Sequence, residues 1–365
     1  MQTTTFGVIV GNRGFFPAAL CKEGRAHMLD VLAQQGYGCV SLDPQATQFN
    51  GAIESYADAK ACAELLRAHA KEIDGVIITL PNFGDERAIA NALRLADLNV
   101  PVLIHAYPDD ADKMSAAHRR DSFCGKMSTA NNLRQYGIAY SLTTRHTCRP
   151  ESQEFLEDLA RFAAVCRIVR RLRRARVGMI GARPAAFNTV RFSEKLLENA
   201  GISVVTIDLS EILGQCAALA DADAAVQSKH TALTHYVKTK AVPGAALLKM
   251  AKLGVVIDRF VAENELVGTA IQCWTSLEEN FGVVPCTLMS MSSNALVPSA
   301  CETDVCGLLG MLALQSATQS CSALVDWNNN YQDDPDKCIV FHCSNLPKDM
   351  FNDPRMEYQA IIAGA

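Results

Sequence analysis

Three residues near the end of the sequence have side chains that could bind a metal ion. Glu302 lies in "PSACETDVCGLLGM", Asp326 follows the apolar run "CSALV", and His342 lies in "CIVFHCSN". Two carboxylates and an imidazole suit an ion of the Mn²⁺ or Mg²⁺ class that keeps open coordination positions. However, acids at helix starts are commonly caps, and a histidine in an apolar strand is commonly a hydrogen-bonded core residue. From these residues alone, both interpretations stay open.

A second candidate chemistry is nucleotide binding near the start of the chain. Gly7, Gly11 and Gly14 surround the strand-like "FGVIV", and Asp43 ends the next such segment, where a dinucleotide-binding fold holds a ribose hydroxyl. The spacing is G-x-x-x-G-x-x-G, whereas the dinucleotide pattern is G-x-G-x-x-G. Because a strand-to-helix turn uses glycine whatever it binds, a structural role is favoured, and a nucleotide-dependent oxidoreductase remains a rival.

A third candidate chemistry is nucleophilic catalysis. Cys124, and Cys148 near His146, could serve as nucleophiles, but no G-x-S-x-G motif is present and the sequence supplies no partner geometry. The chain has 14 cysteines and no Cys-x-x-Cys pair, and most lie in apolar segments. We therefore expect reduced, buried thiols and a cytoplasmic protein.

The bulk composition limits the possible partners. A chain of 365 residues predicts two or three domains. Its net charge of −5 argues against nucleic acid, since phosphate binding requires a basic surface. No apolar run reaches the length of a membrane span, and the N-terminus lacks the pattern of a secretory signal.

The elements that must position these residues alternate between strand and helix. "FGVIV", "GCVSLD", "DGVIITLPN" and "VPVLIHAYP" read as strands, with helices predicted over 57–71 and 85–97. After a predicted helix over 151–173 the pattern repeats with "ARVGMIGARP" and "ISVVTIDLSE". This pattern predicts two doubly wound, Rossmann- or flavodoxin-like parallel-sheet domains.

The predicted domains are 1–172, an N-terminal α/β domain, and 173–346, a second α/β domain that carries the metal site. The remaining 347–365 read as the start of a C-terminal segment. We interpret "DWNNNYQDDPDK" as loop, "CIVFHCSN" as a strand, and "LGVVIDRF" as the opening of a helix.

Several motifs resemble a known family. "AIQCWTSLEENFGVVPCTLMSMSSN", "SACETDVCGLLGM", "LVDWNNN" and "FHCSNLP" resemble the second domain of the L-fucose/L-arabinose isomerase superfamily, and "RRDSFCGKMSTANNLRQYGIAYS" resembles its fucose-isomerase-like branch. The resemblance implies two α/β domains and a C-terminal β-rich domain. It also implies a homo-oligomer with the active site at a subunit interface, which interconverts aldoses and ketoses with Mn²⁺, or with Mg²⁺ or Co²⁺ in its place.

Carried over by position, the resemblance makes Glu302 and Asp326 the acidic metal ligands and the acid/base pair, with His342 as a further ligand. The ion would stabilise an enediolate while a carboxylate moves the proton between carbons. The family's last histidine ligand lies in its C-terminal domain, and no histidine follows His342, so we expect a truncated chain. Asp304 is expected to start a helix.

The resemblance also suggests residues that contact a sugar. An arginine among them could bind an anionic group such as phosphate or sulfonate. The main alternative is a non-catalytic sugar-binding or regulatory protein on the same scaffold. The candidate substrate-binding residues are Trp274, Asn294, Asn328, Arg13, Arg120 and Asp121.

Overall fold

The structure is a computed structural model that describes residues 3–342 and 345–358. The chain divides into two compact units between Arg170 and Arg171, close to the boundary predicted at 172/173. The tail of the predicted C-terminal segment, 359–365, lies outside the described residues, as does Cys343. Each unit is described by itself.

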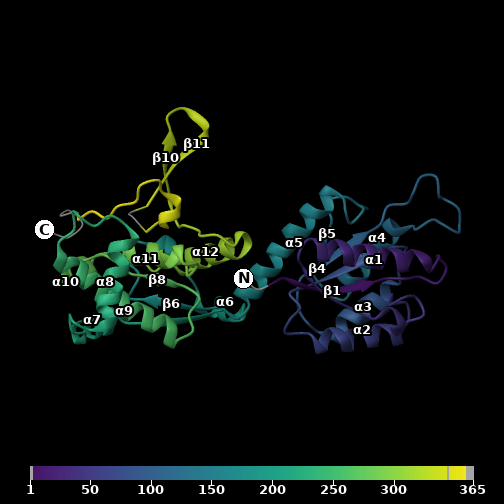
Figure 1. Cartoon of the computed structure of the whole chain (residues 1–365), viewed down its shortest axis with the longest axis horizontal. Coiled ribbons are helices and arrows are strands. Elements are labelled where there is room, and N and C mark those ends of the chain that lie inside the picture. Colours follow the sequence, from purple (N-terminus) through teal and green to yellow (C-terminus); the bar gives the residue numbers. More distant parts are fainter. Residues whose placement is uncertain (1–2, 343–344, 359–365) are drawn as a thin grey trace. The chain divides into compact units, whose positions relative to one another are not determined.

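The first unit contains a parallel five-stranded sheet in the order β2-β1-β3-β4-β5 (Figure 1). Alternate residues of β1 face opposite sides: Val8 packs with one hydrophobic cluster and Ile9 with the other. Because both faces are covered, β3 is buried along its whole length. The strands are β1 (Thr5–Val10), β2 (Gly38–Ser41), β3 (Gly75–Leu80), β4 (Val102–Ala106) and β5 (Ser141–Leu142).

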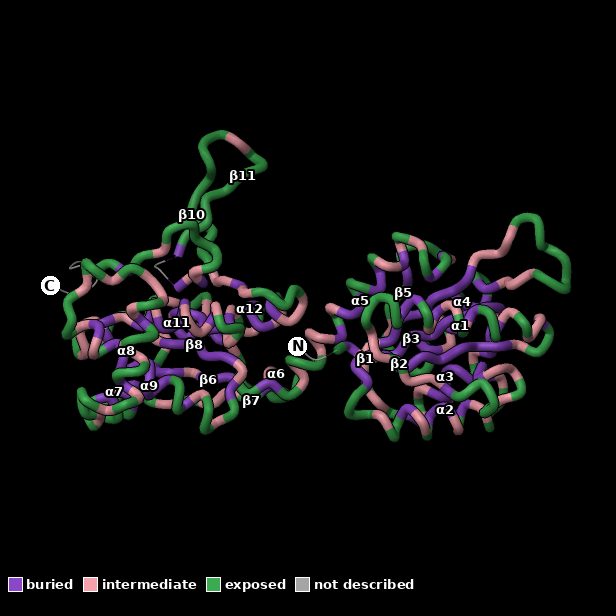
Figure 2. Tube along the Cα trace, in the orientation of Figure 1, coloured by how far each residue is buried: buried purple, intermediate pink, exposed green. Residues whose placement is uncertain are grey.

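Helices cover both faces of this sheet. Residues of α2, α3 and α4 pack against one face, and residues of α1 and α5 pack against the other. Figures 1 and 2 show α2 and α3 together along the lower side of the sheet. The helices are α1 (Ala19–Gln34), α2 (Tyr56–Ala68), α3 (Glu86–Ala96), α4 (Ser122–Gln135) and α5 (Gln153–Leu172), with a 3₁₀ turn η1 (Pro44–Ala46).

The second unit repeats the plan with a parallel four-stranded sheet in the order β7-β6-β8-β9. The two predicted doubly wound domains are therefore confirmed. The strands are β6 (Arg176–Ile180), β7 (Ser203–Ile207), β8 (Thr269–Ile271) and β9 (Ser299–Cys301).

The helices of the second unit again lie in two layers. One hydrophobic cluster joins α7, α8, α9 and α11 to the sheet, and another joins α12 to its opposite face. The segment "LGVVIDRF", expected to open a helix, lies inside α9, because the apolar pattern extends back to Gly244. The elements are η2 (Asn188–Val190), α6 (Glu194–Asn199), α7 (Leu209–Ala218), α8 (Ala224–Tyr236), α9 (Gly244–Glu263), α10 (Ser276–Asn280), α11 (Cys286–Asn294), α12 (Val305–Thr318) and η3 (Lys348–Met350).

An antiparallel hairpin, β10 (Asp326–Tyr331) and β11 (Asp334–Phe341), extends from the second unit (Figure 1). We expected loop over the first of these strands, and that expectation is wrong. The polar run "DWNNNY" pairs along β11, and Gln332 turns the chain with a positive φ of 52°. Every residue of β10 is exposed, so cross-strand pairing rather than burial forms this element.

Two further predictions concern the whole chain. Of the 13 described cysteines, eight are buried, while Cys39, Cys124, Cys306 and Cys338 are exposed. The expectation of buried thiols therefore holds for most of them. Among the described residues, no helix has the length and apolar character to cross a membrane.

Candidate functional site

The carboxyl edge of the first sheet is the first place where polar side chains gather. β1 and β3 pair directly, with Val10 opposite Thr79, although β2 lies between them in the chain. The strand order reverses here, and ligands of doubly wound folds bind at such points. Asn12 and Asn82 are the second residues of the loops that leave these two strands.

Asn12 and Asn82 form a fully buried amide pair. The Oδ1 of Asn82 accepts hydrogen bonds from the backbone N–H groups of Arg13 (3.3 Å) and Gly84 (3.1 Å). Its Nδ2 therefore faces Asn12 and donates to the Oδ1 of that residue across 2.8 Å. The pair joins the two loops at the strand ends.

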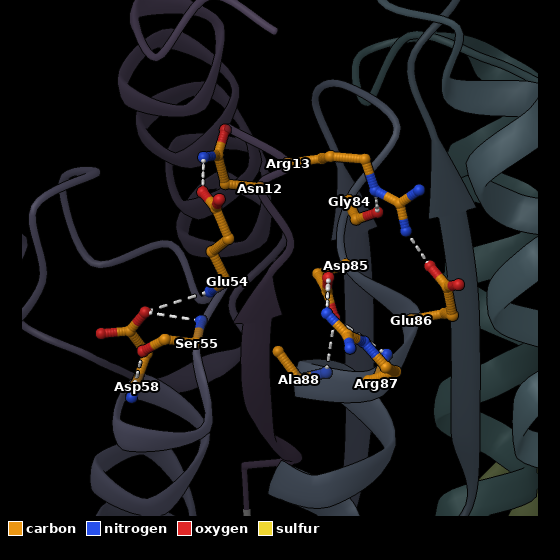
Figure 3. Close-up of polar contacts among 10 residues, drawn as sticks. All are labelled: Asn12, Arg13, Glu54, Ser55, Asp58, Gly84, Asp85, Glu86, Arg87 and Ala88. Carbon is orange, nitrogen blue, oxygen red and sulfur yellow. Dashed lines mark hydrogen bonds and ion pairs between the residues drawn. The ribbon is translucent and has the colours of Figure 1, made fainter. Parts of the chain in front are cut away.

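Glu54 completes this network (Figure 3). Its Oε2 accepts a 2.6 Å hydrogen bond from the Nδ2 of Asn12. Glu54 immediately precedes Ser55, which begins α2 in a capping box with Asp58. The start of this helix thus brings a carboxylate to the sheet edge.

Arg13 is held rigidly beside this network. Its Nε donates to the carbonyl of Gly84 across 3.1 Å and its Nη2 pairs with Glu86 (Figure 3). Its guanidinium also lies 4.4 Å from the centre of the Phe83 ring. These contacts fix a guanidinium, one third exposed, at the strand edge where we predicted a substrate-binding arginine.

Arg120 lies at the same edge, after β4. Its Nη1 donates to the carbonyl of Pro81 across 2.9 Å, and its guanidinium lies 5.4 Å from the centre of the Tyr107 ring. Asp121 instead pairs with Arg119 at 3.2 Å and precedes α4 with a positive φ of 50°. The first sheet therefore presents Arg13 and Arg120, while Asp121 is engaged locally.

The predicted cysteine nucleophiles lie in poor surroundings for that chemistry. Burial raises the pKa of the Cys148 thiol to about 11, so the reactive thiolate is scarce at neutral pH. Exposed Cys124 lies on α4, and His146 stacks on Phe123, with ring centres 4.4 Å apart.

The carboxyl edge of the second sheet holds another group of predicted residues. Ile271 of β8 pairs with Cys301 of β9, so the segments that start at Gln272 and Glu302 leave neighbouring strands. Glu302 and Thr303 both have left-handed backbones, with φ of 62° and 55°. Such conformations are costly for non-glycine residues and cluster at functional sites.

Asp304 ends this turn as the N-cap of α12. Its Oδ1 accepts a 2.7 Å hydrogen bond from the backbone N–H of Gly307. The expectation that Asp304 starts a helix is confirmed.

A hollow of about 390 Å³ opens beside β6 and β8. Trp274, 45% exposed, packs edge-on against Phe187, with ring centres 5.5 Å apart. Gln272 links the segments on the two sides of the hollow. Its Oε1 accepts from the N–H of Ala182 (2.8 Å), and its Nε2 donates to the carbonyl of Trp274 (3.0 Å). Arg183 also lines the hollow. A sugar ring could pack here on the aromatic faces.

The remaining predicted residues lie on and around the hairpin. Asp326 begins β10 and pairs in register with Phe341, the residue before buried His342. Asn328 is exposed on β10. The Oδ1 of Asn294 accepts from the N–H of Asp349 (3.1 Å) and its Nδ2 donates to that carboxylate (3.3 Å), which holds the last segment in place.

The predicted metal ligands do not meet as a set. Glu302 follows β9, whereas Asp326 and His342 lie at the base of the hairpin. Across residues 3–342 and 345–358, no three His, Cys, Asp or Glu side chains gather closely enough to hold one ion. The ligand assignment therefore stays a prediction.

Two of the residues that suggested nucleotide binding, Gly7 and Asp43, have structural roles. A Cβ on Gly7 would lie 2.7 Å from the Leu66 side chain, so helix α2 packs closely on β1 there. The carboxylate of Asp43 accepts the N–H of Gln45 (2.8 Å) and caps η1.

Comparison with known proteins supports the predicted resemblance. Residues 7–173 match the family model described as fucose/sulfoquinovose isomerase, N-terminal domain. This first unit is similar to the N-terminal domain of that isomerase family. This match covers the sheet edge that carries Asn12, Arg13 and Glu54.

The similarity to curated proteins extends beyond the first unit. A sulfoquinovose isomerase of Priestia aryabhattai is 21% identical over 278 residues, 74% of this chain and 59% of the relative. One of Alkalicoccus urumqiensis is 22% identical, with the same shares covered, and one of Clostridium sp. (strain MSTE9) is 25% identical over 53% of this chain and 43% of the relative. The chain thus spans about three fifths of the length of the first relatives.

Sequence reasoning missed several residues of the two sheet edges. Asn12 and Asn82 each lie two positions after an apolar strand, in "VIVGNRG" and "TLPNFGDE", which is the available signal. Glu54, Gln272 and Arg183 carry no comparable signal, because loop packing decides where their side chains lie.

Proposed function

We propose that this protein is an aldose–ketose isomerase acting on an open-chain sugar. The observation that carries the proposal is the similarity, over three quarters of the chain, to proteins named sulfoquinovose isomerases. Because the chain spans only part of those relatives, the activity is assigned to it here as a hypothesis.

The reaction requires a proton to leave one carbon of the sugar and return to its neighbour. We assign this transfer to Glu302 and Asp326, since carboxylates are competent general bases. The left-handed turn at Glu302, which follows the strand paired with β8, supports the assignment. A divalent ion, Mn²⁺ by preference, would stabilise the negative charge of the enediolate, with Glu302, Asp326 and His342 as its proposed ligands.

The proposed substrate is a sulfonated sugar like that of the relatives. Sulfonate is an anion, and arginine suits it because its guanidinium offers several fixed donors. Arg120 is the better candidate in the first unit, because Arg13 already pairs with Glu86. In the second unit, Arg183 lines the hollow and donates to the carbonyls of Pro184 and Ala185. We further propose a homo-oligomer, in which copies of the chain complete one another's sites.

The test is product formation from sulfoquinovose by the chain as given, followed by NMR, with and without Mn²⁺. A panel of unmodified hexoses and 6-deoxy sugars compares substrates. We expect product with sulfoquinovose, loss of product after treatment with a chelator, and recovery on adding Mn²⁺. Glu302→Gln should lower the rate at least about a hundredfold, the scale of general acid–base catalysis.

Glu279→Gln is the matched control, because Glu279 is an exposed carboxylate on α10 of the same unit. Equal rates for Glu302→Gln and Glu279→Gln would refute the catalytic assignment. Sugar binding without product would instead support a non-catalytic binding protein. That alternative is favoured by one observation, namely that the predicted ligands do not gather in the described part of the chain.

A further inference from the structure

We propose that Glu54 binds hydroxyl groups of a polyhydroxylated ligand at the carboxyl edge of the first sheet, with Asn12 and Asn82 as positioning residues. The inference rests on the proposed function for the nature of the ligand, a sugar. It adds a binding carboxylate in the first unit, which neither the sequence motifs nor the family match assigns.

The hydrogen-bond network determines that Glu54 acts as an acceptor. Two backbone N–H groups orient the amide of Asn82, which orients Asn12, which points an N–H at Glu54 (Figure 3 shows the last contact). Both asparagines are fully buried, where an unsatisfied polar atom is costly. The hydrogen bonds therefore run in one direction, from Asn82 through Asn12 to the carboxylate of Glu54.

The side chain of Glu54 is not needed to cap α2, the helix that follows it. Ser55 and Asp58 already satisfy the start of α2 through a reciprocal capping box. The Glu54 side chain instead turns to Asn12 at the sheet edge (Figure 3). Within residues 3–342 and 345–358 it pairs with no Lys, Arg or His, and its Oε1 accepts no hydrogen bond.

Space is kept for this carboxylate at Gly14. A Cβ on Gly14 would lie 2.5 Å from the Oε1 of Glu54, and Gly14 itself is exposed. The backbone of Gly14 is in a region open to other residues, so conformational freedom is not what glycine supplies here. Its missing side chain leaves the outer oxygen of Glu54 accessible.

The chemistry of the edge favours a hydroxylated ligand. A carboxylate held as an acceptor needs a donor, and hydroxyls both donate and accept. Arg13, adjacent to Asn12, supplies donors on the neighbouring side, where it contacts Gly84 and Glu86 (Figure 3). Acceptors and donors together suit a polyol better than a cation, which the arginines would repel.

The test is titration calorimetry of sulfoquinovose into the full chain, with product formation measured on the same samples. Glu54→Gln keeps the size of the side chain and an oxygen for Asn12 but removes the charge. We expect about tenfold weaker binding or more, the scale of a hydrogen bond to a charged group. Glu64→Gln, an exposed carboxylate on α2, is the matched control and should bind like wild type.

Two more variants separate binding from folding. Gly14→Ala leaves every polar group in place but crowds the Oε1 of Glu54, so it should weaken binding while the unfolding curve stays unchanged. Asn12→Asp sets a second carboxylate against Glu54. Its binding should be weak at neutral pH and recover as the pH falls and the two groups share a proton. A purely structural asparagine would show no such recovery.

The outcomes distinguish the two proposals. Product formation with equal binding by wild type and Glu54→Gln overturns the inference and leaves the isomerase proposal in place. Binding lost in Glu54→Gln, with no product from wild type, supports the inference and overturns the isomerase. Absence of binding by wild type at millimolar sulfoquinovose overturns the inference, whatever the product assay gives.

Discussion

Asn82 donates a 2.8 Å hydrogen bond to Asn12 across the point where the first sheet reverses its strand order, and both side chains are fully buried. Together with the hydrogen bonds from Arg13 to Asn82 and to Gly84, this contact joins the loops after β1 and β3. The three contacts couple the position of Arg13 on one loop to that of Gly84 on the other.

Asn82→Asp should destabilise the first unit. The new carboxylate would face the Oδ1 of Asn12 and leave that buried acceptor only the weak thiol donor of Cys21, at a cost of roughly 1–3 kcal/mol. Urea unfolding followed by circular dichroism measures the change. Asn131→Asp, exposed on α4, is the control. Equal unfolding midpoints for the two variants would contradict the structural role of the pair.

His105 should make the first unit sensitive to mild acid. It is fully buried and accepts from the Thr79 hydroxyl through Nδ1, while Nε2–H donates to the carbonyl of Cys148. Burial lowers the pKa of His105 from 6.5 to about 3. Between pH 6.5 and about pH 3, His105 is protonated in the unfolded chain but stays neutral in the folded chain. The free energy of unfolding therefore falls as the pH drops, by up to about 1.4 kcal/mol per pH unit from this group.

His105→Gln removes that titration. Comparing urea unfolding at pH 7 and pH 5 should show a smaller loss of stability for His105→Gln than for wild type. His69→Gln, a half-exposed control on the same unit, should keep the wild-type loss. An unchanged pH dependence in His105→Gln would mean that other groups account for it.

Gly125→Ala should strongly destabilise the first unit. Its Cβ would lie 1.8 Å from the carbonyl oxygen of Phe83, so α4 packs directly on the backbone beside Asn82. Overpacking of this kind costs roughly 1–3 kcal/mol or more. Gly214→Ala in α7 meets nothing within 4 Å and should stabilise by about 0.5–1 kcal/mol. Thermal unfolding of both variants checks the opposite signs.

Asp304→Ala should weaken α12 by about 0.5–2 kcal/mol, because the N–H of Gly307 loses its acceptor. Asp304→Asn should retain most of the stability, since asparagine caps equally well. Urea unfolding of the two variants measures the difference. If Asp304→Asn lost as much stability as Asp304→Ala, the charge rather than the cap would matter.

Trp274 should report sugar binding in the hollow. The chain has two tryptophans, so Trp327→Phe leaves Trp274 as the sole emitter. Trp274 is 45% exposed and packs on Phe187, and a sugar that covers it should change its emission. Trp274→Phe, with only Trp327 on the exposed hairpin, is the control. A response that follows Trp327 instead would place the sugar elsewhere.

The sequence was sufficient for the architecture and for the local role of Asp304. Runs such as "GVIITL" are apolar on both sides and identify buried parallel strands, because a strand covered on both faces has no polar side. A carboxylate just before the apolar run of α12 was expected to begin that helix, and its side chain accepts the N–H of Gly307. These features depend on residues a few positions apart. The polar strand β10 was not predicted, because it forms through pairing with β11 and its composition gives no strand signal.

Only the tertiary structure determines which side chains meet at the two sheet edges. Asn12, Glu54 and Asn82 come from three separate loops, and they meet because β1 pairs with β3 while α2 starts beside them. Likewise Gln272 and Glu302 become neighbours through the pairing of β8 with β9. Such contacts depend on strand order and loop packing, which link residues tens of positions apart. The sequence identified Glu302 as a candidate, but only the fold placed it in a left-handed turn at the end of β9, next to β8.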